Sequence, residues 1–308
     1  MLNAAGADVI RIGTRGSPLA LAQAHETRLR LMQAHGLEEN QFEIVVISTT
    51  GDRILNQPLA EIGGKGLFTL EIEEALQAET IDLAVHSMKD MPATLPDGLA
   101  FAANLPREDA RDAFVSLMAK SLHELPQGAV LGSSSVRRNA QALRIRPDLQ
   151  SVQFRGNVQT RMRKLADGVA MGTFLAVAGL NRLGMSQHIS AIMEMGEMLP
   201  AVAQGAIGIE IKTSNRNARS LVEAIHHKPT GIAIACERAF LAKLEGSCRT
   251  PIAGHATISG NTLSFRGQIL SLDGKESAET SLSGPVEDAV AIGIEAATRA
   301  AAQQKIPA

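Results

Sequence analysis

Short apolar runs alternate with amphipathic, helix-like segments over the first two-thirds of the chain. One helix is expected to begin at Ser17 and Pro18 and to end near Gly36, because a serine cap, a proline in the first turn and a terminal glycine mark helix boundaries. Strands that alternate with helices predict a parallel, doubly wound sheet. The expected strands are 9–12, 42–48 and 81–86, and a second helix covers 67–78.

The same alternation resumes with a strand at 129–132, a helix at 137–145 and a buried strand at 173–178. Two strand-to-helix turns, 12–17 and 131–138, resemble each other. Each brings hydroxyl side chains and arginine to a helix start, where unpaired backbone N–H groups favour an anion. The sequence therefore predicts two similar α/β halves.

Two segments are expected to connect these halves. Residues 106–112 are polar and contain Pro106, which predicts a crossover with a hinge, and residues 199–211 are expected to return to the first half. Beyond Lys228 the pattern changes to a hairpin at 258–269, a further strand up to Ser271 and an alanine-rich helix at 286–302. This pattern is typical of an α+β C-terminal domain.

The predicted fold class is α/β, with two doubly wound domains and a smaller α+β C-terminal domain. Domain 1 is assigned residues 1–105 and 200–224, domain 2 residues 106–199, and domain 3 residues 225–308.

Composition limits the classes of function. The 308 residues include 30 Lys and Arg against 32 Asp and Glu, and the net charge of −2 argues against a protein that is basic all over and coats nucleic acid. Eight Phe with no Trp or Tyr offer few platforms for stacking bases. No apolar run approaches the roughly 20 residues that cross a bilayer.

Cysteine usage predicts a reducing compartment. The chain has two cysteines, too few for a disulfide framework, and neither lies in a zinc-ligand pattern. The first 15 residues contain an acidic residue and no continuous apolar segment, so they do not have the pattern of a signal peptide. We expect a cytoplasmic protein.

Basic residues are concentrated between Arg137 and Lys164. This segment contains eight basic residues and one acidic residue, Asp148. Arginine binds carboxylates and phosphates through two parallel hydrogen bonds, so the cluster predicts a site for a polyanion. From charge alone, a solvated helix face is an equal alternative. Position favours the site, because Arg137, Arg138 and Arg155 follow strand ends, where open α/β sheets bind ligands. Arg144, Arg146 and Arg163 are expected at the surface.

The segment from His86 to Asp90 also follows a predicted strand. Neighbouring cationic side chains favour the ionised form of Asp90, so it suits a permanent anion that faces a developing cation. The alternative is a helix-cap or salt-bridge aspartate. His86 is expected to be a packed residue at the strand end.

The run Gly63-Gly64-Lys65-Gly66 lacks the spacing and the hydroxyl of a nucleotide-binding loop. A mobile lid that carries Lys65 and a plain turn both remain open.

The two cysteines differ in their setting. Cys248 lies in a short segment rich in small and polar residues, where adjacent Arg249 favours the reactive thiolate. Cys236 lies in a helical pattern and is expected to be inert. His255 is the nearest histidine for a cysteine hydrolase, but its spacing does not support a catalytic triad.

Distinct motifs lie at residues 12–20, 63–68, 86–90, 134–138 and 155–161 and in the Cys248 loop. Taken together, they resemble the porphobilinogen deaminase, or hydroxymethylbilane synthase, family. They occur in the family's order over nearly the whole chain. The resemblance implies three domains, of which the first two are built like type II periplasmic binding proteins and the third carries the cofactor cysteine.

The resemblance also implies a reaction. Such transferases join four molecules of porphobilinogen head to tail, release four molecules of ammonia and hydrolyse the product off as hydroxymethylbilane in haem biosynthesis. The chain grows on a dipyrromethane cofactor held through a thioether, here to Cys248. Every pyrrole brings an acetate and a propionate, which gives the arginine cluster a purpose. No metal, nucleic-acid or membrane partner is implied, and a monomer is expected.

By similarity, Asp90 is the catalytic residue and stabilises the azafulvene cation that forms when ammonia leaves the substrate. The implied cofactor-binding residues are Cys248, Arg137, Arg138, Lys89, Ser87, Ser133, Ser135, Arg155 and Asp90, and the implied substrate-binding residues are Arg15, Ser17, Arg155, Arg161, Arg182, Lys65, Phe68 and Gln204.

The chain departs from the family pattern at three positions. Glu61 and Leu70 stand where many members have lysine, and Gly172 replaces a common acidic residue. These positions lie outside the residues assigned to chemistry and affect the charge of the predicted lid.

Two other classes of function remain as rivals. A non-catalytic binding protein would share the hinge and the anion-binding turns, but it does not need the Cys248 loop. A nucleic-acid-binding function would depend on the arginine cluster alone.

Overall fold

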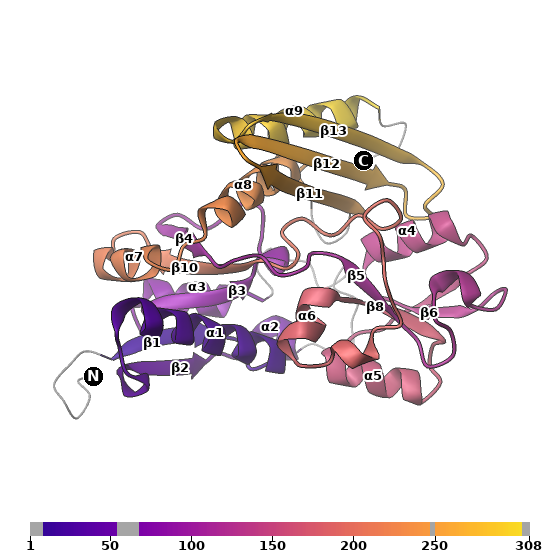
Figure 1. Cartoon of the computed structure of the whole chain (residues 1–308). Coiled ribbons are helices and arrows are strands. Elements are labelled where there is room, and N and C mark those ends of the chain that lie inside the picture. The colour runs from indigo at the N-terminus through magenta and orange to yellow at the C-terminus, as the bar shows by residue number, and fades with distance from the viewer. Residues whose placement is uncertain (1–8, 54–67, 247–249, 304–308) are drawn as a thin grey trace. The chain divides into compact units, whose positions relative to one another are not determined.

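The computed structural model describes residues 9–53, 68–246 and 250–303, and they form three separate β-sheets (Figure 1). The chain divides into two compact units. Unit 1 comprises residues 1–56, 64–107 and 206–231, and unit 2 comprises residues 57–63, 108–205 and 232–308.

Unit 1 contains a five-stranded mixed sheet in the order β2-β1-β3-β10-β4. The first three strands are parallel, and β10 runs antiparallel to both of its neighbours. Helices α1 and α7 pack on one face of this sheet, and α3 packs on the other. The elements are β1 (Ile10–Thr14), α1 (Pro18–His35), β2 (Phe42–Val46), α2 (Thr50–Arg53), α3 (Leu70–Gln77), β3 (Leu83–Ser87), β4 (Leu99–Asn104), β10 (Ile207–Lys212) and α7 (Arg216–Glu223).

Local capping determines the ends of α1, as the sequence predicts. The Ser17 side chain accepts a hydrogen bond from the backbone N–H of Ala20, and Pro18 occupies the first turn. Gly36 ends the helix with φ of 64°, a left-handed conformation that favours glycine. Local signals therefore set the two limits of α1.

Unit 2 contains a second five-stranded sheet in the order β7-β6-β8-β5-β9. Its pattern repeats that of the first sheet, because three parallel strands are followed by β5, which is antiparallel to both neighbours. The elements are β5 (Asp112–Val115), β6 (Val130–Gly132), α4 (Val136–Ile145), β7 (Gln150–Val152), α5 (Val158–Ala166), β8 (Gly172–Ala176), α6 (Val177–Arg182) and β9 (Ala191–Ile192).

Strands β5 and β8 are buried on both faces, so apolar side chains occupy adjacent positions in each strand and do not alternate with exposed polar ones. Phe114 and Phe174 point into the core beneath α4, whereas Leu175 points into the core beneath α5 and α6. The predicted strand at 173–178 is wrong at its end, since α6 begins at Val177. The apolar run continues across this boundary, so periodicity could not locate it.

Both connections that the sequence predicts are present. Strand β4 belongs to the first sheet and β5 to the second, so residues 105–111 cross from one to the other. Strand β10 lies in the first sheet between β3 and β4, so the chain returns after residue 199 as expected. This late strand completes the first sheet from a distant part of the sequence.

The third sheet is an antiparallel meander of β11 (Ile252–Ser259), β12 (Thr262–Leu270) and β13 (Ser277–Pro285), which α9 (Ala289–Ala302) covers. The predicted hairpin turn is present at Gly260, whose φ is 59°. Strand β13 was not predicted, because its inward side chains, such as Ala278 and Thr280, are small or polar. Helix α8 (Lys228–Lys243) precedes this sheet.

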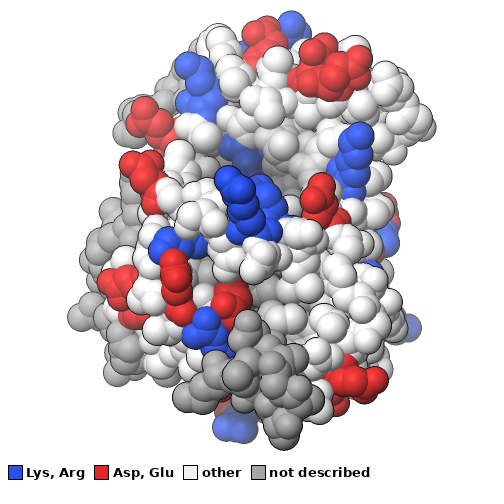
Figure 2. Space-filling model, turned by 90° about the vertical axis from the view of Figure 1, so that its left-hand side faces the viewer, with Lys and Arg blue, Asp and Glu red and all other residues white. Residues whose placement is uncertain are grey.

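These three sheets confirm the predicted fold class, two doubly wound α/β sheets and a smaller α+β C-terminal part. Acidic and basic side chains are interspersed on the face that Figure 2 draws. Among the helices that the structure describes, none combines the length and the apolar character needed to cross a membrane.

Candidate functional site

A serine-rich turn joins β6 to α4 and places two arginines in the first turn of that helix. Ser135 caps α4, since its Oγ accepts a hydrogen bond from the backbone N–H of Arg138 at 3.4 Å. Ser133 Oγ accepts one from the N–H of Ser135 at 3.2 Å, and Ser134 Oγ accepts one from the N–H of Phe154 at 2.8 Å. The three hydroxyl groups thus hold the turn in place.

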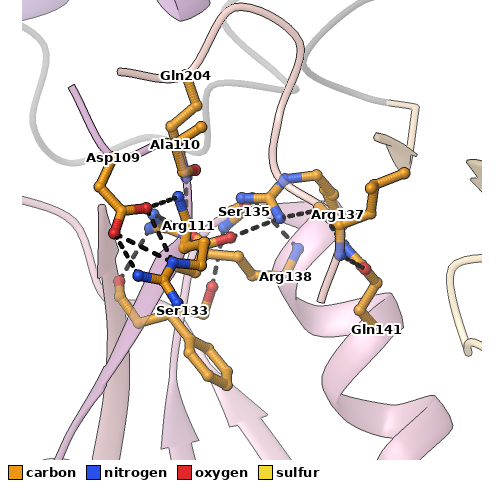
Figure 3. A network of polar contacts seen from close by, with 12 residues as sticks. Asp109, Ala110, Arg111, Ser133, Ser135, Arg137, Arg138, Gln141 and Gln204 are labelled. Carbon is orange, nitrogen blue, oxygen red and sulfur yellow. Dashed lines mark hydrogen bonds and ion pairs between the residues drawn. The ribbon is translucent and has the colours of Figure 1, made fainter. Parts of the chain in front are cut away.

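Arg137 and Arg138 both bind the carboxylate of Asp112, the first residue of β5. Figure 3 labels the two arginines within the surrounding network of polar contacts. Arg137 Nη1 lies 2.8 Å from Asp112 Oδ2, and Arg138 Nη2 lies 2.7 Å from Asp112 Oδ1. All three side chains are buried. Burial alone would raise the pKa of Asp112, but the charges of the two arginines outweigh it and hold the pKa well below its ordinary value.

Gln204, a predicted substrate-binding residue, is a member of this network. Its side chain is buried, and its Nε2 donates to the Ala110 carbonyl oxygen at 2.7 Å and to Asp112 Oδ1 at 3.0 Å. Gln141 on α4 makes two hydrogen bonds to the backbone of Leu199. The Gln204 amide nitrogen is therefore directed into the protein.

The remaining predicted arginines of unit 2 follow the same edge of the sheet. Arg155 and Arg161 follow β7, and Arg182 lies in α6, which follows β8. Arg161 Nε donates to the Gly156 carbonyl oxygen at 2.9 Å, and Arg182 Nη2 donates to the Gly205 carbonyl oxygen at 3.1 Å. The carboxyl ends of parallel strands meet at one edge, so these arginines share it with Arg137 and Arg138.

The surface expectation is right for Arg144 and Arg163, which are exposed, and wrong for Arg146. Arg146 is half-buried, and its Nη2 binds Asp148 Oδ2 at 2.7 Å at the C-terminal end of α4. Its Nη1 also donates to backbone carbonyl groups, including that of Leu125. Arg146 thus has a structural role that charge counting could not reveal.

In unit 1, Arg15 follows β1 and is held by two side chains. Its guanidinium pairs with Asp52 and lies over the ring of Phe68, 4.2 Å from the ring centroid. Burial would raise the pKa of Asp52, but hydrogen bonds from Arg15 and Thr49 lower it overall. Ser17 serves as the cap of α1 in the same turn.

The end of β3 carries the remaining predicted residues. Ser87 Oγ donates to Gln23 Oε1 at 2.9 Å, and Lys89 is half-buried. Asp90 is exposed, and no described residue makes a hydrogen bond or an ion pair with it. Its carboxylate is therefore available to a ligand. His86 is a buried strand-end residue, as predicted.

The two cysteines behave differently. Cys236 is fully buried in α8, and burial raises the pKa of its thiol to about 12, so it is the inert residue that the sequence predicts. Cys248, Lys65 and Glu61 lie outside the described residues.

Sequence analysis missed Asp112 and Asp52, the carboxylates that hold the predicted arginines. Asp112 was assigned to the polar crossover, although it begins the buried run Asp112-Ala113-Phe114-Val115. An acidic residue at the head of a buried strand is rarely left without a partner, and this was the available signal.

Comparisons with known proteins identify the family. Residues 10–220 match the family model described as porphobilinogen deaminase, dipyromethane cofactor binding domain. Residues 232–302 match the model of the porphobilinogen deaminase C-terminal domain. The chain belongs to the porphobilinogen deaminase family. The predictions of a transferase of tetrapyrrole biosynthesis and of a dipyrromethane cofactor are therefore confirmed.

Individual relatives agree with this family. The chain is 59% identical to porphobilinogen deaminase of Paracoccus denitrificans over 288 residues. The aligned region covers 94% of this chain and 92% of the relative. It is 56% identical to the chloroplastic porphobilinogen deaminase of Oryza sativa over 283 residues. This aligned region covers 91% of this chain and 79% of the relative.

The chain also matches solved structures of binding proteins. The methionine binding protein MetQ has a TM-score of 0.45 at 15% identity and covers 70% of this chain and 89% of its own. A periplasmic substrate-binding protein of an ABC transporter from Coxiella burnetii has a TM-score of 0.43 at 16% identity and covers 75% of this chain and 97% of its own.

Proposed function

We propose that this chain joins four porphobilinogen molecules head to tail. Asp90 is the catalytic carboxylate, and Cys248 is the cofactor attachment site. The carboxylate-binding site is the arginine bank, which comprises Arg137, Arg138, Arg155, Arg161 and Arg182. Each addition releases one ammonia, and water finally releases hydroxymethylbilane. When bound, dipyrromethane supplies the pyrrole carbon to which the first substrate molecule is joined.

One observation carries the assignment of the arginines. Arg137 and Arg138 together carry two positive charges beside the single negative charge of Asp112, all in a buried network at the N-terminus of α4. The remaining positive charge and the helix N-terminus both favour an anionic ligand. Acetate and propionate groups fit this requirement, because guanidinium binds carboxylates through two parallel hydrogen bonds.

The other arginines extend this site. Arg155, Arg161 and Arg182 bring further cations to the same sheet edge, where they bind carboxylates of the substrate and of the growing chain. The same task is assigned to Arg15, Ser17, Ser87, Lys89, Lys65 and Phe68, and Gln204 is assigned to substrate binding.

Asp90 provides the negative charge for the reacting ring. It is exposed and has no partner among the described residues, so its carboxylate can face the pyrrole nitrogens of a bound ligand. A positive charge develops on the substrate as ammonia departs, and a fixed anion close to it lowers the energy of that state.

Cys248 is the attachment residue that the chain offers. The other cysteine, Cys236, is fully buried, and its pKa is raised to about 12, so it supplies almost no thiolate near neutral pH. Two cysteines are present in the whole sequence, which leaves Cys248 to form the thioether.

Three domains carry these tasks in the proposal. Residues 1–105 with 200–224 hold Asp90, residues 106–199 hold the arginine bank, and residues 225–308 hold Cys248. The three separate sheets support this division. The enzyme is proposed to act as a cytoplasmic monomer on porphobilinogen, without nucleic-acid or membrane partners. The interspersed charges of Figure 2 are in keeping with this proposal.

Intact mass spectrometry tests the proposal. The protein purified from cells that make porphobilinogen is expected to carry an added mass of two linked pyrrole units. The adduct is expected to disappear in Cys248→Ala and to remain in Cys236→Ala, which is the matched control.

Three outcomes would contradict the proposal or one of its parts. An unmodified wild-type protein from such cells would favour a non-catalytic binding protein. An adduct that survives Cys248→Ala would move the attachment site elsewhere. Retention on DNA at moderate salt would favour the nucleic-acid-binding alternative.

A further inference from the structure

Asp112 accepts hydrogen bonds from four side-chain nitrogen atoms. Its Oδ2 accepts from Arg137 Nη1 at 2.8 Å, and its Oδ1 accepts from Arg138 Nε at 3.0 Å and Arg138 Nη2 at 2.7 Å. Gln204 Nε2 also donates to Oδ1, at 3.0 Å. No other carboxylate in the described part of the chain binds two arginines that are themselves buried.

The two arginines have different donors left over. Arg138 uses Nε and Nη2 on Asp112, and its Nη1 donates to the Phe174 carbonyl oxygen at 2.9 Å. Arg137 uses only Nη1, which donates to Asp112 and to the Leu199 carbonyl oxygen at 2.9 Å. Its Nε and Nη2 have no partner among the described residues. These two atoms form the edge of a guanidinium that binds a carboxylate through two hydrogen bonds.

Without Asp112, the two guanidinium groups would be adjacent and buried with no compensating anion. Burial already lowers the pKa of Arg137, and the charge of Arg138 lowers it further, while Asp112 opposes both effects. Two such groups would separate or turn toward solvent. The open edge of Arg137 would then lose its fixed orientation.

We propose that Asp112 is the positioning residue of the cofactor-carboxylate site, which holds Arg137 and Arg138 in place before a ligand binds and cancels one of their two charges. The pair then presents one positive charge and one open edge, so it accepts one carboxylate. This inference rests on the proposed function of the arginines.

Unit 1 contains a related arrangement that supports the inference. Asp52 binds Arg15, which follows β1 as Arg137 follows β6. Each of the two sheets therefore has an arginine that follows an equivalent parallel strand and a carboxylate that orients it. In both cases the carboxylate comes from a different segment of the chain than the arginine.

The experiment compares Asp112→Asn with Asp148→Asn. Asp148 pairs with Arg146 at the opposite end of α4, so its variant breaks an arginine–aspartate pair of the same unit away from the site. Apoprotein of each variant is incubated with porphobilinogen, and the rate of adduct formation is followed by intact mass. KM and kcat are then measured on the loaded fraction, and thermal unfolding is recorded for each variant.

Asp112→Asn is expected to slow adduct formation and to raise KM, each on the order of tenfold, because a charge-assisted contact loses its orientation. The kcat of loaded enzyme is expected to change less than KM. Asp148→Asn is expected to lower the unfolding temperature and to leave adduct formation and KM at wild-type values. A loss of stability alone would affect both variants alike.

A double variant keeps the test informative if Asp112→Asn folds poorly. Asp112→Asn with Arg138→Gln removes one charge of each sign, so Arg137 alone retains the single positive charge of the wild-type trio. This variant is expected to regain stability and to keep the raised KM, since Arg137 has still lost its orienting carboxylate.

The outcomes separate the inference from the proposed function. Wild-type adduct formation and KM in Asp112→Asn, or a wild-type KM in the double variant, would overturn the role of Asp112 and leave the arginine site intact. Normal adduct formation in Arg137→Gln would instead overturn the proposed cofactor-carboxylate site, whatever Asp112 does.

Discussion

His86 on β3 and Glu210 on β10 form a buried pair, with 2.9 Å between His86 Nε2 and Glu210 Oε2. The two residues lie on antiparallel neighbouring strands, and Gly208 of β10 is opposite His86 in the register. Met88 packs against Gly208, and the turn that follows carries Asp90. The pair therefore joins the late strand β10 to the strand that ends at the proposed catalytic carboxylate.

Breaking this pair from the histidine side is expected to destabilise the protein. His86→Leu would leave the buried Glu210 side chain without this hydrogen-bond partner, which costs about 1–3 kcal/mol in the free energy of unfolding. His86→Leu combined with Glu210→Leu is expected to cost less than His86→Leu alone, because neither substitution then leaves a buried polar partner behind. Urea unfolding measures both costs, and a double variant less stable than the single variant would contradict the pair.

Glu73 on α3 makes the stability of unit 1 depend on pH. Burial raises the pKa of Glu73 above its ordinary value of 4.5, and the nearby Glu210 carboxylate adds to this, while His86 opposes it. The folded protein then holds the proton more tightly than the unfolded chain does. Stability from this group is therefore fully present below pH 4.5 and is lost as the pH rises through the folded value.

Glu73→Gln is expected to remove this loss and to raise the free energy of unfolding at pH 7 by on the order of 1 kcal/mol. The gain is expected to vanish below about pH 4, where wild-type Glu73 is protonated. Glu74→Gln, at the exposed neighbouring position, is the control and should change stability little at either pH. A gain of equal size at both pH values would exclude titration of Glu73 as its cause.

The Phe114 ring packs directly against Gly172 and leaves no room for a side chain at that position. A side chain at 172 would overlap the Phe114 ring, which is fully buried. Gly172→Asp is expected to lower the free energy of unfolding by about 2 kcal/mol. Phe114→Leu in the same chain should reduce this additional cost. Gly196→Asp is the control, since a side chain there enters open space, and an equal loss at both glycines would contradict the steric cause.

Local and long-range features differ in how far the sequence could predict them. Ser17, Pro18 and Gly36 give the limits of α1, because caps act within a few residues of the helix end. The partners of Arg15 and Arg137 could not be predicted in this way. Asp52 and Asp112 come from other segments, and only the folded sheets bring them to the arginines.

Asp52 is expected to affect substrate affinity through Arg15. Asp52→Asn removes the charge that orients the Arg15 guanidinium, so KM for porphobilinogen is expected to rise on the order of tenfold. Asp82→Asn is the matched control, because Asp82 pairs with Arg11 near the start of the same strand, β1. Steady-state kinetics on cofactor-loaded enzyme measure the KM of both variants. An Asp52→Asn KM equal to that of Asp82→Asn would assign Asp52 a purely structural role.

Asp90 supplies a sharper test, because charge and shape can be changed separately. Asp90→Glu keeps the negative charge and is expected to retain measurable turnover, whereas Asp90→Asn keeps the shape and is expected to lower kcat by about 10²–10³-fold. Intact mass must first show that each variant carries the cofactor, since attachment uses the same chemistry. Asp97→Asn, at an exposed position further along the same loop, should keep wild-type kcat. An Asn variant that is loaded and as active as the wild type would show that the fixed negative charge does not stabilise the developing cation.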